Sequence, residues 1–241
     1  YSGYFPNKKL NSKPVKSIVY FNNNESVSID NKKSKVRTTT EKSNDDQSLS
    51  IKLPYGDDYG RQIYRNIKDS LVITRRPKNV ISEPFIVKEN WLNIKWDIKN
   101  KTKKIGNYKV TKAIGHFRGR NFTAWFTYDI PVPFGPWKLH GLPGLILEAE
   151  DSEKMMRFHI TEIKIPFDTN KIIKTPVAEN EITHKEEIYL SDNFDKLLAK
   201  KMNARLPKGS KMTPKPNNDG RKYKPEKIYE WETETINDKK N

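Results

Sequence analysis

The chain has 241 residues, of which 34% are hydrophobic, 11% aromatic and 32% charged. This length suits one large domain or two small ones, with one favoured if the chain is mostly β. The low apolar fraction predicts an aromatic-rich core confined to part of the chain. The chain has no cysteine, which excludes disulfides, thiolate metal sites and a cysteine nucleophile. No stretch approaches the ~18 apolar residues of a membrane-spanning helix, so we expect the chain not to span a membrane.

The formal net charge is +16, and the positive charge is concentrated in the flanks of the chain. The most apolar part, residues 113–163, is close to neutral, and lysine-rich segments such as residues 100–104 have the composition of inert loops. A nucleic-acid-binding protein more often interleaves basic and aromatic residues on one element, so nucleic acid is not a predicted partner. We interpret the charge as a solubilising surface; attraction to an acidic partner or an anionic surface is the alternative.

Strand patterns dominate the first hundred residues. Residues 18–21 and 26–29 predict two short strands around an Asn-rich turn, and residues 63–74 predict a strand pair. In residues 90–98 apolar and polar side chains alternate, which predicts a half-buried strand.

The centre of the chain gives the clearest signal. Residues 108–118 and 122–130 predict a long β-hairpin with a short Gly-containing turn. Residues 145–149 and 156–165 predict a second hairpin.

The last third of the chain contains a single strong helical pattern, at residues 192–205. Residues 207–227 predict a basic Pro/Lys/Asn-rich loop or linker, and residues 227–236 a possible last strand. The predicted fold is therefore mainly β and forms a single domain over residues 1–241. We expect a curved antiparallel sheet or half-open barrel with one helix on its side; a closed β-sandwich is the alternative.

A Pro/Gly-dense loop follows the first long hairpin, at residues 131–144. Within it Pro143 and Gly144 occupy the second and third positions of a turn, which predicts a type II turn. Several of its side chains, including Phe134 and Trp137, are too apolar to lie in water. They must pack beneath the loop or contact a partner.

This loop and the preceding hairpin carry a resemblance to a known family. The hexapeptide Gly141-Leu142-Pro143-Gly144-Leu145-Ile146 resembles the motif that names the GLPGLI family of Bacteroidetes proteins. The surrounding residues are similar too: Gly119, Arg120, Ala124, Trp125, Phe126, Thr127, Ile130, Pro131, Gly135, Pro136, Leu147 and Glu148. Members of the family often carry a cysteine where this chain has Val110, so a function that needs that thiol fails here.

What the resemblance implies is a compartment rather than a reaction. It implies an exported protein whose signal peptide has been removed, located in the periplasm, at the outer membrane or at the cell surface. It further implies an association with TonB-dependent outer-membrane transporters, because family members are often encoded beside them. No cofactor follows from the resemblance.

Candidate catalytic or metal-binding residues are scattered along the chain. The four histidines lack the i, i+2 or i, i+4 spacing of metal ligands, and no metal site is predicted: His116, His140, His159 and His184. Asp129 and Glu148 can form a catalytic carboxylate pair, but no pattern fixes their separation. Arg118 and Arg120 flank the hairpin turn, where they can bind a partner or remain solvated.

We therefore interpret the protein as a non-catalytic exported binding protein that acts with a partner at the outer membrane. The predicted partner-binding residues are Phe134, Pro136, Trp137, Trp125 and His140; packing of the aromatic side chains against the sheet is the alternative reading. Two other functions stay open. One is a periplasmic carrier of an apolar ligand lined by Phe122, Phe126 and Leu147. The other is a hydrolase or metal-dependent enzyme that uses Asp129, Glu148 and histidines.

Overall fold

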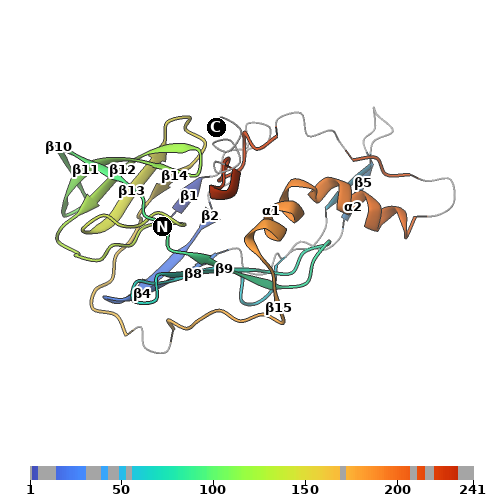
Figure 1. Cartoon of the computed structure of the whole chain (residues 1–241), viewed down its shortest axis with the longest axis horizontal. Helices are drawn as coiled ribbons and strands as arrows, with labels where there is room; N and C mark the ends of the chain where they lie inside the picture. Colours follow the sequence, from blue (N-terminus) through green and yellow to red (C-terminus); the bar gives the residue numbers. More distant parts are fainter. Residues whose placement is uncertain are drawn as a thin grey trace, which may run out of the picture.

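The chain folds mainly into β-sheets, as the sequence predicts. The computed structural model describes residues 2–4, 15–30, 39–42, 49–52, 56–168, 172–206, 211–214 and 220–232. Within them the strands form a seven-stranded sheet, a six-stranded sheet and a two-stranded ribbon. Figure 1 shows the two large sheets next to each other, with the helices beyond the six-stranded sheet.

The seven-stranded sheet is antiparallel throughout and has the order β10-β11-β12-β13-β14-β1-β2. Its strands are β1 (Ser2–Tyr4), β2 (Val15–Lys16), β10 (Trp96–Ile105), β11 (Tyr108–Phe117), β12 (Arg120–Thr127), β13 (Leu145–Asp151) and β14 (Arg157–His159). Both predicted hairpins are confirmed here, the first as β11–β12 and the second as β13–β14, although β14 ends at His159 and the predicted strand at residues 160–165 is absent.

The six-stranded sheet has the order β15-β9-β8-β7-β4-β3 and is antiparallel except for β15, which runs parallel to β9. Its strands are β3 (Ile18–Phe21), β4 (Glu25–Asp30), β7 (Arg61–Asn66), β8 (Leu71–Arg76), β9 (Phe85–Asn90) and β15 (Asn180–Glu181). The predicted strands at residues 18–21 and 26–29 and the pair within residues 63–74 are therefore confirmed. The ribbon consists of β5 (Thr39–Lys42) and β6 (Leu49–Lys52).

The strand predicted at residues 90–98 is wrong. β9 ends at Asn90, residues 91–95 form no regular element, and β10 begins at Trp96. The alternation arises because this segment passes from one sheet to the other: Trp91 and Leu92 are half-buried and Ile94 is buried against the main hydrophobic cluster. The lysine-rich residues 100–104, interpreted as a loop, instead form half of β10, at the end of the sheet order.

The described residues contain two helices where one was predicted. α2 (Phe194–Asn203) corresponds to the predicted helix, and α1 (His184–Asp192) precedes it. α1 lacks a wide apolar stripe, but Thr183 and Glu186 form a capping box at its start. Neither helix is long and apolar enough to cross a membrane, and the same holds for every helix in the described residues.

The C-terminal segment, residues 220–232, packs on the rest of the molecule without forming a strand. Glu226 and Tyr229 within it are buried, and residues 230–232 form a short helical turn. The strand predicted from residue 227 is therefore wrong as far as residue 232; its remainder, and much of the predicted linker, lie outside the described residues.

The largest hydrophobic cluster joins the two sheets. Ile63 and Val72 from the six-stranded sheet meet Phe122, Phe126 and other side chains of the seven-stranded sheet. A second cluster includes Val110, Leu145 and Leu147. Because the Pro/Gly-rich loop contributes to both clusters, its position is fixed by the core.

Candidate binding site

The Pro/Gly-rich loop is buried rather than displayed. The exposed fraction of Phe134 is 0% and that of His140 is 2%, and Pro136 is buried as well. Arg65 of β7 reaches the loop and donates from one amino group to the carbonyl oxygens of Gly135 and Leu139 at 2.9 and 3.3 Å. Phe134, Pro136 and His140 therefore pack the loop against the sheets, as the alternative interpretation from the sequence expects.

His140 is held between backbone carbonyl groups. Its two ring nitrogens lie 2.7 Å from the carbonyl oxygens of Lys138 and Leu92, and its ring lies 4.0 Å from that of Trp91. Burial lowers the pKa of His140 to about 4, although the two carbonyl contacts oppose this shift. His140 is a structural part of the loop.

The type II turn predicted at residues 142–145 is wrong. That turn needs a positive φ at its third residue, and Gly144 does not have one; Gly141 does, with φ 90°. Gly144 is required for a different reason. A Cβ atom there would lie 1.9 Å from the carbonyl oxygen of Thr127, so only glycine fits between the loop and β12.

Trp125 lies on β12 and packs against the second hydrophobic cluster, to which Val132 and Phe134 of the loop also belong. It is half-buried, and the ammonium group of Lys103 sits 4.4 Å from the centre of its ring. Lys103 also pairs with Glu148 at 2.9 Å. These contacts do not test whether Trp125 binds a partner, which stays a prediction.

Trp137 differs from the other loop residues because it borders a cavity. Its ring packs against those of Phe117 and Phe122, with centroids 5.7 and 6.2 Å apart. Its φ is +52°, a left-handed conformation that is costly for a large side chain. A cavity of about 430 Å³ opens beside it.

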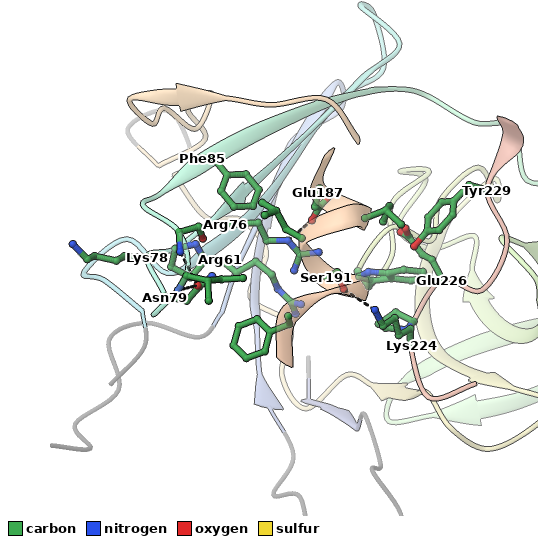
Figure 2. A pocket seen from close by; sticks show the side chains of 18 residues that line it. Arg61, Arg76, Lys78, Asn79, Phe85, Glu187, Ser191, Lys224, Glu226 and Tyr229 are labelled. Atoms are coloured by element: carbon green, nitrogen blue, oxygen red, sulfur yellow. Dashed lines mark hydrogen bonds and ion pairs between the residues drawn. The ribbon is translucent and has the colours of Figure 1, made fainter. Parts of the chain in front are cut away.

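Four segments that are distant in sequence converge on this pocket: residues 61–85 of the six-stranded sheet, Trp137, residues 187–194 of the helices and residues 224–229. The lining residues are Arg61, Arg76, Pro77, Lys78, Asn79, Ile81, Ser82, Phe85, Trp137, Glu187, Ile188, Leu190, Ser191, Phe194, Lys224, Pro225, Glu226 and Tyr229. Figure 2 shows Arg76 and Lys78 on one side of the pocket, Lys224 and Tyr229 on the other, and the α1 ribbon between them.

A cluster of buried charges lies against the base of the pocket. Glu89 accepts from Lys138 at 2.6 Å and from Arg118 at 2.7 Å, and Glu226 accepts from the same two cations at 2.8 and 3.0 Å. Burial alone would raise the pKa of Glu226, but Lys138, His184 and Arg118 hold it well below its usual value. The pKa of Lys138 is raised despite burial, because Glu226 and Glu89 stabilise its charge.

His184 extends this cluster toward α1. Its Nδ1 lies 3.5 Å from Glu89, and its Nε2 lies 3.5 Å from Glu226 and 3.9 Å from Glu187. Ligand atoms of Glu89, His184 and Glu187 lie within 4.8 Å of one another, the spacing of a possible metal site. Both oxygens of Glu89 already pair with buried cations, however, so a metal ion would have to compete with Arg118 and Lys138. We assign no metal to this group.

Arg120, in contrast, belongs to a structural site. It pairs with Asp151 and donates to the carbonyl oxygens of Lys222, Lys224 and Pro225, which fastens the C-terminal segment to the hairpin turn. Arg118 and Arg120 are both buried, so the interpretation of these residues as solvated is wrong. Both bind partners within the chain.

The residues of the predicted hydrolase are not brought together at the pocket. Asp129 is exposed, Glu148 pairs with Lys103, and His116 contacts Asn121 at 2.9 Å. His159 lies opposite Glu148 on the neighbouring strand. None of these residues lines the described pocket. Of the four histidines only His184 is adjacent to it, through its contacts with the lining residues Glu187 and Glu226.

Sequence reasoning missed most of the pocket. Only Trp137 and the helix that carries Phe194 were singled out. The other lining residues come from α1, which was not predicted, and from strands, loops and the C-terminal segment. One signal was present: Lys138 is a charged residue inside the most apolar loop of the chain, and a charge in such a place requires a buried partner.

Comparisons with known proteins support the family only over a short segment. A family model described as "Protein of unknown function (Porph_ging)" matches residues 116–148, which include the hexapeptide. It represents a Bacteroidetes-type family of unknown function and is compatible with the GLPGLI resemblance. No curated protein matches the sequence.

The solved structures that resemble this chain include PNGF-II in two crystal forms. They are 19% and 20% identical to it, with a TM-score of 0.48 in each case. The likeness covers 79% of this chain and 32% of the PNGF-II chain, so this chain spans about one third of that protein. We draw no functional conclusion from so weak a likeness.

Proposed function

We propose that the protein is a non-catalytic, exported binding protein whose ligand site is the pocket beside Trp137. The observation that carries the proposal is the convergence of four chain segments on one cavity of about 430 Å³. This volume lies within the range of about 300–1,000 Å³ that is typical of small-molecule sites. Two of the lining residues, Ser82 and Glu187, also hold a buried side-chain oxygen that makes no hydrogen bond in the structure.

The ionisable groups beneath the pocket favour binding over acid–base catalysis. A general acid or base works best with a pKa near the working pH. The pKa values of Glu89 and Glu226 are instead held low by Lys138 and Arg118, and each carboxylate is engaged by both cations. These carboxylates stabilise the base of the pocket and are poor proton shuttles at neutral pH.

The pocket also differs from the apolar carrier site considered from the sequence. Phe122, Phe126 and Leu147 have exposed fractions of 0–1% and belong to the two packed hydrophobic clusters. They do not line the pocket. A carried ligand would therefore bind between the six-stranded sheet and the helices rather than inside the curved hairpin sheet.

A screen for ligands tests the site directly. Ligands that raise the melting temperature of the wild type should lose this effect in Ser191→Trp, because Ser191 is exposed at the pocket and an indole there fills the entrance. Asp195→Trp, on the exposed surface of α2 and outside the lining, is the matched control and should behave as the wild type. If ligands stabilise Ser191→Trp as much as the control, the site is wrong.

The outer-membrane location and a TonB-dependent transporter as partner remain part of the proposal. They are supported by the family resemblance around residues 116–148. Affinity purification from solubilised membranes of the native host, followed by mass spectrometry, should recover such a transporter with the wild type. Recovery of soluble proteins alone would contradict the location and the partner without affecting the pocket.

A further inference from the structure

The floor of the pocket is apolar. Phe85, Trp137, Ile188 and Tyr229 have exposed fractions between 3% and 9%, so only a small part of each side chain faces the cavity. Phe194 extends this surface to the entrance, where 37% of the residue is exposed. An apolar ligand group would lose water here without disturbing the core.

The entrance of the pocket is cationic. Four of the lining residues, Arg61, Arg76, Lys78 and Lys224, are positively charged. Arg61 pairs with Asp30, Lys224 with Asp192, and Lys78 with Glu83. Figure 2 shows the Lys78 side chain pointing away from the other lining residues, whereas the Lys224 ammonium group points toward Ser191. The Lys224–Asp192 pair is partly exposed, with side-chain fractions of 22% and 28%. An anionic ligand can therefore compete with Asp192 for Lys224.

The two acidic lining residues do not oppose an anion at the entrance, because their charges are neutralised at depth. Glu226 is paired with Arg118 and Lys138, and Glu187 accepts from Arg76 Nε at 2.5 Å. Arg76 retains 37% exposure of its side chain at the pocket. Its guanidinium, although paired with Glu187, is thus still accessible to an anionic ligand.

We infer that the ligand of this pocket is a small amphipathic anion, with an apolar chain or ring on the aromatic floor and one acidic group at the cationic entrance. This inference rests on the proposed function and specifies its ligand. The formal charge of +16 adds a long-range attraction for anions that salt would screen.

The test compares three amphiphiles with the same ten-carbon chain: decanoate, decanol and decyltrimethylammonium. Binding is followed by calorimetry below the concentration at which each forms micelles. Decanoate should bind about tenfold more tightly than decanol, and decyltrimethylammonium more weakly than either, because exposed ion contacts add modest free energy. The preference for decanoate should fall as salt is raised.

Removal of one charge at the pocket separates the local effect from the net charge. Lys224→Gln should weaken decanoate binding about fivefold and leave decanol binding unchanged. Lys222→Gln makes the same change of charge at an exposed position outside the lining, and should change decanoate binding less than twofold. Melting temperatures of both variants report whether the fold is intact.

The outcomes distinguish this inference from the proposed function. Equal binding of decanoate and decanol, both blocked by Ser191→Trp, overturns the anionic ligand and leaves the site in place. Decanoate binding that Ser191→Trp does not weaken overturns the site itself. If none of the three amphiphiles binds the wild type, the ligand class is wrong, and the broader screen decides the site.

Discussion

Two neighbouring regions of this molecule differ in what their side chains do: in the Pro/Gly-rich loop and its hairpin they hold the fold together, and in the pocket beside Trp137 some remain accessible. In the hairpin and loop that carry the family resemblance, the characteristic groups are committed to the fold: Arg120 is fully engaged, and Gly144 lies where no side chain fits. In the lining of the pocket, by contrast, Ser82 and Glu187 each have a side-chain oxygen without a hydrogen bond, and Phe194 is partly exposed.

This difference indicates that the residues that stabilise the fold and the residues that would bind a ligand are largely separate sets. The hexapeptide motif lies almost wholly in the first region, whereas the pocket is built from residues outside it, with Trp137 as the link between them. Proteins that share the motif should therefore share the loop packing, and their ligands should differ with the residues that line the pocket.

The largest effect is expected at Gly144. Gly144→Ala places a Cβ atom 1.9 Å from the backbone oxygen of Thr127, so β12 or the loop must move. We expect a loss of more than about 4 kcal/mol in the free energy of unfolding. Gly106→Ala is the control: its φ is +55°, but no atom lies within 4 Å of the added Cβ, so it should cost about 1 kcal/mol. Equal stability of the two variants in urea would contradict this account.

The next effect is expected at Arg120. Arg120→Ala leaves the carboxylate of Asp151, whose side chain is 1% exposed, without its cation. It should lower the free energy of unfolding by about 3–5 kcal/mol. Arg157→Ala breaks an ion pair with Glu150 whose arginine is 55% exposed, and should cost less than about 1 kcal/mol. Denaturant melts of both variants check the contrast, and similar losses would show that burial does not set the cost.

Trp137 should show both roles at once. Trp137→Ala removes ring contacts with Phe117 and Phe122, so it should cost about 3 kcal/mol of stability. It should also abolish binding of a pocket ligand. Trp125→Ala, at a half-buried position outside the pocket lining, should cost less, about 1 kcal/mol, and leave pocket binding intact. A Trp137→Ala protein that is as stable as the wild type and binds equally well would refute both roles.

His140 gives the loop a defined pH dependence. Burial lowers its pKa in the folded state to about 4, below the ordinary value of 6.5. As pH falls below 6.5 the unfolded chain takes up this proton first, so stability should be lost between pH 6.5 and 4, by at most about 3 kcal/mol. His140→Gln should flatten this part of the stability profile, whereas His116→Gln, at an exposed position, controls for the loss of a histidine. An unchanged slope in His140→Gln would mean that other groups cause it.

The sequence predicts the hairpins well because their signals are local. In β11–β12 and β13–β14 the alternation of side chains and the turn residues lie within one short segment. The sequence pattern is misleading at residues 90–98, where the alternating side chains lie in a segment that passes from one sheet to the other. It also fails at α1, whose capping box is informative but whose apolar face is narrow. Both failures reflect packing that a local pattern does not contain.

The pocket could not be predicted for a related reason. Its cations and aromatic residues come from segments up to about 160 residues apart, such as Arg61 and Lys224, and no short motif joins them. The sequence places Trp137 in a loop that has to pack, but it does not reveal that Glu226, in a segment interpreted as a linker, lies beneath the same site. Only the fold brings such residues together.

The smallest effect on stability, and the sharpest test of the difference between the two regions, is expected at Phe194. This residue begins α2, lines the pocket entrance and is 37% exposed. Phe194→Ala should therefore lower the free energy of unfolding by less than about 1 kcal/mol, yet weaken a pocket ligand about tenfold by removing its contact surface. Tyr189→Ala, on α1, removes an aromatic side chain that is 60% exposed and outside the lining, so both its stability and its binding should stay near the wild type. If Phe194→Ala binds like Tyr189→Ala, the entrance plays no part in recognition; if it unfolds like Trp137→Ala, Phe194 belongs with the structural residues of the loop.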